Sequence, residues 1–181
     1  MLERITLYHG TIHFFDAIGI SYGKPFKDFG IGFYTSRDRE HAERMALRNR
    51  EIELSRIRKR SADRHVDALL YSFEFGLDNL NSLNIKEFKV PDREWMRFVI
   101  ANRTHKEQQH SYDMVIGPTA NDNTLTAIGL FFAGAYGDTK SDAAVDRLIE
   151  QLEPQKLPWQ YFFGSKKAAE LLILKEREIL S

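Results

Sequence analysis

Two short segments of this sequence combine glycine with a histidine or with an aromatic pair, a combination that suits a ligand pocket. The segment "LYHGT" carries His9 and Gly10 at the end of an apolar run, and "DFGIGFYTS" carries Phe33 and Tyr34 after two glycines. An imidazole donates or accepts a hydrogen bond, an aromatic ring stacks on a planar group, and glycine lets the backbone approach closely. The segments are interpreted either as two walls of one pocket or as two ordinary strands that end in turns.

Other chemistry is poorly supported by the residue types. The sequence has no cysteine, so it offers no thiolate ligand and no cysteine nucleophile. Its six histidines show no metal-ligand spacing and no H-E-x-x-H motif. A basic run over 56–60, "RIRKR", is either the solvated face of a helix or a contact for phosphates.

Length, composition and charge indicate the kind of protein that carries these residues. The 181 residues are 43% hydrophobic, enough to fill a core, and they predict one domain over 1–181. Lys and Arg together number 26, as do Asp and Glu, so no overall charge directs the protein to nucleic acid. No apolar run approaches the length of a signal peptide or of a membrane span, and a cytoplasmic protein without a membrane partner is expected.

The hydrophobic pattern predicts alternating strands and helices. Glycine-bounded runs rich in aromatic and β-branched residues indicate strands, and spacings of three and four between apolar residues indicate helices. The segment 11–28 is expected to be a loop with one helical turn, and 77–88 a loop or short strand. Strands are expected at 4–10, 30–36, 66–76, 112–118 and 159–164. Helices are expected at 36–64 (opening at a Ser36 cap), 92–103, 124–136, 141–152 and 165–180, the last one amphipathic.

The order of these motifs resembles the ADP-ribosyltransferases of the diphtheria-toxin and poly-ADP-ribose polymerase branch. The resemblance rests on "YHGT", on "GIGFYTS" running into the helix "REHAERMA", and on the late segment "WQYFFGSKKA". The resemblance extends through "WMRFVIANR" and "YDMVIGPTANDNT" over nearly the whole chain. The sequence is similar to a bacterial family found in toxin–antitoxin-like gene pairs. It implies an α+β fold with a split, strongly bent mixed β-sheet and surrounding helices, which binds NAD in a cleft between the two halves.

The resemblance also implies roles for individual residues. His9 would bind a ribose hydroxyl of NAD, the Gly10 backbone would hold the nicotinamide carboxamide, and Tyr34 would stack on the nicotinamide ring. Bond cleavage to nicotinamide builds oxocarbenium character on the ribose, as glycoside cleavage does. Further contacts to NAD are expected from Thr11, Phe33, Thr35 and Asn121.

The third motif departs from the family pattern. Gln160 stands where active relatives carry a glutamate, and an amide can hydrogen-bond a ribose hydroxyl but cannot act as a general base. Asp113, at the head of the strand "YDMVIGP", and Asp122, in "ANDN", are candidates for the missing carboxylate. Their alternative roles are a turn residue for Asp113 and a helix N-cap for Asp122.

The leading hypothesis is mono-ADP-ribosyl transfer from NAD to a macromolecular acceptor, protein or nucleic acid, by a bacterial toxin whose partner is a small antitoxin protein. A second hypothesis is a non-catalytic module that binds NAD or ADP-ribose, which Gln160 favours. A third is a protein that binds nucleic acid or another partner through the basic run over 56–60.

Overall fold

A computed structural model describes residues 3–59, 64–120, 123–152 and 158–181. The strands are β1 (Arg4–Thr11), β2 (Phe33–Ser36), β3 (Ala68–Gly76), β4 (Ile85–Glu87), β5 (Met114–Pro118), β6 (Trp159–Phe163) and β7 (Ile173–Leu180). The helices are α1 (Arg39–Lys59), α2 (Arg93–Thr104), α3 (Thr124–Phe132), α4 (Asp142–Gln151) and α5 (Lys166–Ala169), with short 3-10 turns η1 (Ile20–Tyr22) and η2 (Leu77–Ser82).

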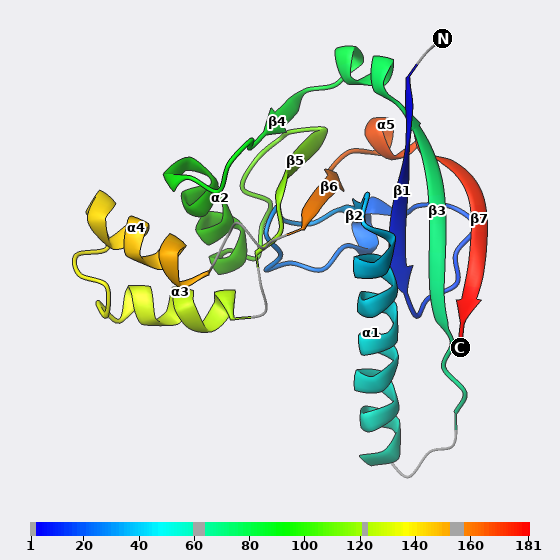
Figure 1. Cartoon of the computed structure of the whole chain (residues 1–181), viewed down its shortest axis with the longest axis horizontal. Helices are drawn as coiled ribbons and strands as arrows, with labels where there is room; N and C mark the ends of the chain where they lie inside the picture. The colour runs from blue at the N-terminus through cyan, green and yellow to red at the C-terminus, as the bar shows by residue number, and fades with distance from the viewer. Residues whose placement is uncertain (1–2, 60–63, 121–122, 153–157) are drawn as a thin grey trace.

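The described strands form one seven-stranded mixed sheet in the order β4-β5-β6-β2-β1-β3-β7. The β4 and β5 strands run parallel, whereas the other neighbours are antiparallel. Figure 1 shows β1, β3 and β7 side by side with α1 along them, and α2, α3 and α4 on the far side of β5 and β6. The predicted α+β class with a mixed sheet and surrounding helices is confirmed.

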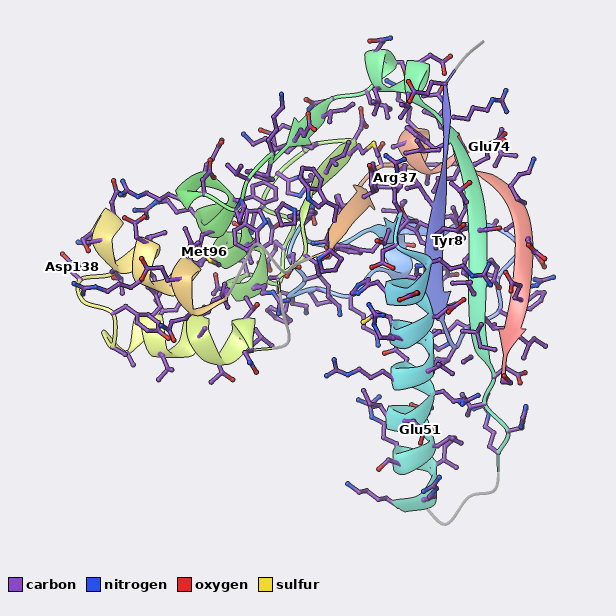
Figure 2. The ribbon with its side chains drawn as sticks, viewed as in Figure 1. Tyr8, Arg37, Glu51, Glu74, Met96 and Asp138 are labelled. Atoms are coloured by element: carbon purple, nitrogen blue, oxygen red, sulfur yellow. The ribbon has the colours of Figure 1, made fainter. Side chains whose placement is uncertain are left out.

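The sheet has a narrow joint in its middle. In the described chain, β1 and β2 pair at one position, Tyr8 opposite Ser36, whereas β1 and β3 pair along all of β1. The joint separates a half-sheet of β1, β3 and β7 from a half-sheet of β4, β5, β6 and β2. Tyr8 at the joint and Met96 on α2 can be located in Figure 2. Past Tyr8 and Ser36, the two strands diverge.

Two buried clusters fill the space on the sheet's faces. One gathers α2, α3 and α4 over β5 and β6, with Trp95, Val115 and Phe162 completely buried. The other lies under β1, β3 and α5, with Leu7 and Phe163 completely buried. Side chains alternate in direction along β6, so Phe162 and Phe163 point to opposite faces of the sheet and belong to different clusters.

Helix starts mostly follow the capping rules. Asp92 caps α2 by accepting from the Trp95 amide, and Ser141 caps α4 as expected. The expected Ser36 cap of the long helix is wrong, because Ser36 ends β2 and the Asp38 carboxylate accepts from the His41 amide at 2.9 Å. The α1 helix is mostly solvated, as predicted, and buries Ala42 and Ala46.

The predicted helix over 165–180 is wrong. Residues Lys166–Ala169 form a short helix, but Ile173–Leu180 form β7, which pairs with β3 at the edge of the sheet. The register of β7 shifts opposite Ser72 and Phe73. Six of its eight residues are exposed and two are half-buried, so its pattern lacks strict alternation. The helix predicted to reach residue 136 ends at Phe132, near Gly134 with φ 80°.

Candidate functional site

His9 stands where β1 and β2 separate. Its Nδ1 lies 2.7 Å from the carbonyl oxygen of Tyr34, and its ring lies 4.3 Å from that of Phe33 and 5.9 Å from that of Phe15. Exclusion of water lowers the pKa of His9 to about 4, with a smaller contribution from His13 and against the opposing effect of the bond to Tyr34. The imidazole is therefore neutral at pH 7, with Nδ1–H donating to the carbonyl and Nε2 left as an acceptor.

Tyr34 is oriented by its hydroxyl group. The hydroxyl donates to the carbonyl oxygen of Gly30 at 2.7 Å and accepts from the Phe29 amide at 3.1 Å, and the ring edge packs on Phe162. Burial, and then the charge of Asp28, raise the pKa of Tyr34, so the phenol keeps its proton. These contacts fix the ring plane of a half-buried tyrosine. They leave stacking on a planar ligand as a prediction.

The packing of α1 on β1 explains why position 10 is a glycine. A Cβ at this position would lie 1.8 Å from the backbone oxygen of Ala42, so glycine allows α1 to lie directly on β1. Extending the Tyr8–Ser36 register by two residues places Gly10 across the opening from Tyr34. The helix thus covers one face of Gly10.

The neighbouring residues predicted to bind NAD lie on the other face. Phe33 is buried against His9, and the buried hydroxyl of Thr35 donates to the Tyr161 carbonyl at 3.2 Å. Thr11 is also buried, and its hydroxyl accepts from the His13 amide at 3.2 Å. The structure therefore gathers His9, Phe33, Thr35 and Thr11 on the face opposite Tyr34.

Gln160 belongs to a buried polar network. Its Nε2 donates to Asp28 Oδ2 at 3.0 Å, and the same oxygen accepts from the Ala120 amide at 2.9 Å. The other carboxylate oxygen of Asp28 accepts from Nε of Arg103 at 2.6 Å. Asp28 and Gln160 are 4% and 7% exposed. Because only an amide NH₂ can face a carboxylate favourably, Asp28 fixes the Gln160 side chain and turns its Oε1 away.

The same network explains the glutamine in physical terms. A glutamate at position 160 would bring a second carboxylate to the Asp28 oxygen, and like charges at this separation disfavour ionisation of both. Ser36 and Gly117 flank Gln160 in the same row across the sheet. Gln160 therefore lies two strands from Tyr8, on the Tyr34 face.

The structure does not bring Asp113 to Gln160. Asp113 precedes β5 at the end where Met114 pairs with Phe163, whereas Gln160 pairs with Gly117 near the other end. Its carboxylate accepts from the Asn84 amide at 2.9 Å, and hydrogen bonds from Ser165 and then Asn84 lower its pKa. These contacts support its role as a turn residue. Asp122 and Asn121 lie outside the described residues.

A family model described as "Protein of unknown function (DUF3990)" matches residues 5–174. The chain belongs to the DUF3990 family. The matched range contains His9, Tyr34, Asp28, Arg103 and Gln160. No curated protein and no solved structure matches the chain.

Two site residues of this DUF3990 protein were missed by the sequence interpretation. Asp28 begins the quoted segment "DFGIGFYTS", and a charge at the start of a buried, glycine-rich stretch was a usable signal. Arg103 falls four residues after buried Val99 and seven after buried Met96, so it shares the buried face of α2. Only the tertiary contact reveals that the two residues form a pair.

Glutamine and histidine side chains hold the rest of the glycine segment of this DUF3990 chain. Gln108 Oε1 accepts from the Ile31 amide at 2.6 Å, and His110 Nε2 lies 2.8 Å from the Phe29 carbonyl oxygen. Burial lowers the pKa of His110, so it donates as a neutral imidazole. Gly30, with φ 86°, lies against Gln108. The segment that carries Asp28 is thus fixed on several sides.

Two surface hollows of the DUF3990 chain lie away from these residues. One of about 610 Å³ is lined by α2 and α4 residues such as Asp92 and Asp146, and another of about 360 Å³ by residues such as Arg50 and His65. Within the described ranges, no three His, Asp or Glu side chains gather as metal ligands. No helix in those ranges combines the length and apolarity needed to cross a bilayer.

Proposed function

We propose that this protein cleaves NAD and transfers ADP-ribose to a macromolecular acceptor. The observation that carries the proposal is a neutral histidine at the opening between β1 and β2. With Nδ1–H committed to the Tyr34 carbonyl, His9 Nε2 can accept a hydrogen bond from a ribose hydroxyl. The narrow joint between the half-sheets supports the split sheet of the ADP-ribosyltransferases as the finer description of the fold.

The chemistry of this proposal relies on binding and orientation. Tyr34 would stack the nicotinamide across the opening from Gly10, and Gln160 Oε1 would accept from a second ribose hydroxyl. As the glycosidic bond breaks, positive charge develops on the ribose while nicotinamide leaves as a neutral base. The acceptor nucleophile then bonds to the same carbon and loses its proton. Holding the reactants in line supplies much of the acceleration in such a step.

A second candidate is a module that binds NAD or ADP-ribose without turnover. The observation that favours it is the Gln160 amide bond to Asp28, since the site then presents a neutral amide where a carboxylate would stabilise an oxocarbenium ion. Asp28 itself is committed to Arg103, Ala120 and Gln160. The bacterial toxin with a small antitoxin partner is the proposed setting of the transferase.

The test combines NAD binding by calorimetry with release of nicotinamide. We expect His9→Ala and Tyr34→Ala each to weaken NAD binding by about 1–3 kcal/mol, as the loss of one buried polar or aromatic contact does. Phe132→Ala, a change of an exposed aromatic residue on α3, is the matched control and should bind NAD like wild type.

The two candidates give different results. Nicotinamide release by wild type above background, lost in His9→Ala, supports the transferase. Binding without release, in the presence of cell extract, supports the module. Equal NAD affinity in wild type and both site variants would remove the pocket from this part of the chain.

A further inference from the structure

The loop between β1 and β2 presents two aromatic rings to solvent. Tyr22 is 89% exposed and Phe26 is 46% exposed, although aromatic side chains of this size are usually at least partly covered. They are interleaved with lysines in the sequence "SYGKPFKD", which also holds exposed Lys24 and Lys27. Rings alternating with cations on one short segment form a surface that could stack bases and contact phosphates.

This loop is anchored rather than loose. The Tyr22 and Gly23 amides donate to the carbonyls of Gly19 and Ile20 at 3.1 and 3.0 Å, forming the turn η1. At its far end, the Gly30 amide donates to the Lys27 carbonyl at 3.1 Å, and Asp28 is held by the buried bond from Arg103. The exposed rings therefore stand on a fixed backbone, which lowers the entropy lost on binding a ligand.

Phe26 is held in an unfavourable conformation. Its φ is 62°, in the left-handed region that a bulky side chain seldom adopts, and in the described chain it is the non-glycine residue with positive φ. Glycine at this position would relieve the strain, so the phenylalanine side chain is present at a conformational cost. Its ring packs in neither buried cluster. A ligand contact gives the ring a function.

Positive charge surrounds the same segment. Partial burial lowers the pKa of Lys27, and the charges of Arg103, Lys24 and Arg48 lower it further, against the opposite effect of Asp28. Arg48 lies on α1 and Arg103 on α2, so the cations come from three separate elements. Asp28 offsets Arg103, so Lys24 and Lys27 leave the loop itself with a net positive charge. This favours an anionic ligand.

We propose that the loop around Tyr22 and Phe26 binds single-stranded nucleic acid, which serves as the ADP-ribose acceptor. The two rings stack unpaired bases, and Lys24 and Lys27 contact the phosphates that flank them. The same loop continues through Phe29 and Gly30 to the Tyr34 hydroxyl, so a bound strand lies next to the candidate NAD site. The acceptor role rests on the proposed transferase function, whereas binding of the strand does not.

The test is fluorescence anisotropy with labelled 20-nucleotide single strands of DNA and of RNA, and with the duplex of the same sequence, in the absence of NAD. We expect wild type to bind a single strand more tightly than the duplex, and Tyr22→Ala with Phe26→Ala to weaken binding about tenfold or more. Lys24→Ala with Lys27→Ala should weaken binding and reduce the salt slope by about 1.4, for two lost phosphate contacts. Comparison of the DNA and RNA strands shows which of the two nucleic acids the loop prefers.

Controls separate the loop from general effects. Phe132→Ala and Lys166→Ala with Lys175→Ala remove an exposed ring and two exposed lysines elsewhere, and both should bind like wild type. Phe26→Gly should weaken binding while the melting temperature does not fall, because the strained φ is relieved. A lower melting temperature would indicate that the ring is structural.

Failure of this surface is distinguishable from failure of the transferase. Wild type that binds no single strand, or loop and control variants of equal affinity, overturns the proposal even if nicotinamide is released. Tighter binding of the duplex overturns it as well. Strand binding that depends on the loop, without nicotinamide release in the presence of the strand, supports the surface and contradicts the transferase.

Discussion

The two half-sheets on either side of the joint hold their key polar residues in different ways. His9, on the half with β1, β3 and β7, is a neutral ring between aromatic neighbours with one bond to a carbonyl of the other half. Gln160, on the half with β5, β6 and β2, is tied through Asp28 to the charged group of Arg103. His9 is therefore held by apolar surroundings, whereas Gln160 is held by a buried charge that an ion pair compensates.

Because of this difference, a substitution of the key polar residue should cost different amounts of stability in the two half-sheets. A buried ion pair makes removal of one partner costly, because the other charge remains in an apolar environment. A neutral histidine can be replaced with a smaller loss, since only its protonation is unfavourable there. Stability should therefore depend strongly on the Asp28 network, and ligand binding on His9.

Arg103→Met should have the largest effect. It leaves the Asp28 carboxylate buried without its cation, and we expect a loss of about 3–5 kcal/mol in the free energy of unfolding. Urea denaturation followed by circular dichroism measures it. Asp28→Asn in the same chain should recover part of the loss, because no uncompensated charge is then buried.

Arg93→Ala is the matched control for Arg103. Arg93 also pairs with carboxylates, those of Asp142 and Asp146, but on the solvated surface, where ion pairs contribute little. Its melting temperature should stay close to that of wild type. Equal losses for Arg103→Met and Arg93→Ala would contradict the view that burial makes the Asp28 network costly to break.

Gln160→Glu should have the next largest effect. It places a second carboxylate beside Asp28, and we expect destabilisation of about 1–3 kcal/mol at pH 8. The repulsion raises the folded-state pKa of one carboxyl above its unfolded value, so stability is present at low pH and lost as pH rises through that pKa. Thermal unfolding from pH 5 to pH 8 measures the trend. A deficit that does not change with pH would argue against the contact.

The pH dependence contributed by His9 should be opposite in sign. Its folded pKa of about 4 lies below the unfolded value, so the unfolded chain takes up the proton first and stability falls as pH falls from about 6.5 toward 4. The slope from one group is at most about 1.4 kcal/mol per pH unit. His110, whose pKa burial also lowers, acts in the same direction.

His9→Gln should reduce this acid sensitivity without abolishing it, because His110 contributes in the same direction. Chemical denaturation at pH 4.5 and 7 gives the comparison. Identical acid sensitivity in wild type and His9→Gln would mean that His9 is not held neutral.

The smallest effect is expected on α1. Arg58 and Lys59 lie exposed at its end, so Arg58→Ala with Lys59→Ala should change the melting temperature by no more than about 2 °C. Calorimetric scanning measures it. A large fall in melting temperature would show that this end of the helix packs against the rest of the protein.

Local patterns predicted much of the fold. Caps and spacing located α2 and α4, and apolar runs located β3, β5 and β6, because these signals lie within a few neighbouring residues. The β7 strand was missed because its partner β3 lies about a hundred residues away, as pairings such as Leu69 with Ile179 require. The sequence between them contains no sign of that pairing.

The site was predicted less completely than the fold. The motifs pointed to His9, Tyr34 and Gln160, and the structure places all three near the joint. They could not indicate that alternation turns His9 and Tyr34 to different faces, since that depends on where the strands separate. Nor could they indicate that Asp28 and Arg103 pair across 75 residues of sequence, which is a contact between a loop and a helix end.

The strand order also has a consequence for the order in which this protein is made. β2 emerges from the ribosome early, yet its neighbour β6 is not synthesised until residue 163, and β3 waits for β7 until residue 180. Neither half-sheet can close while the nascent chain is shorter than these lengths, and pairing across long separations is slow. The nascent chain should therefore expose open strand edges for most of its synthesis, a period in which a chaperone has more to bind than at any later time.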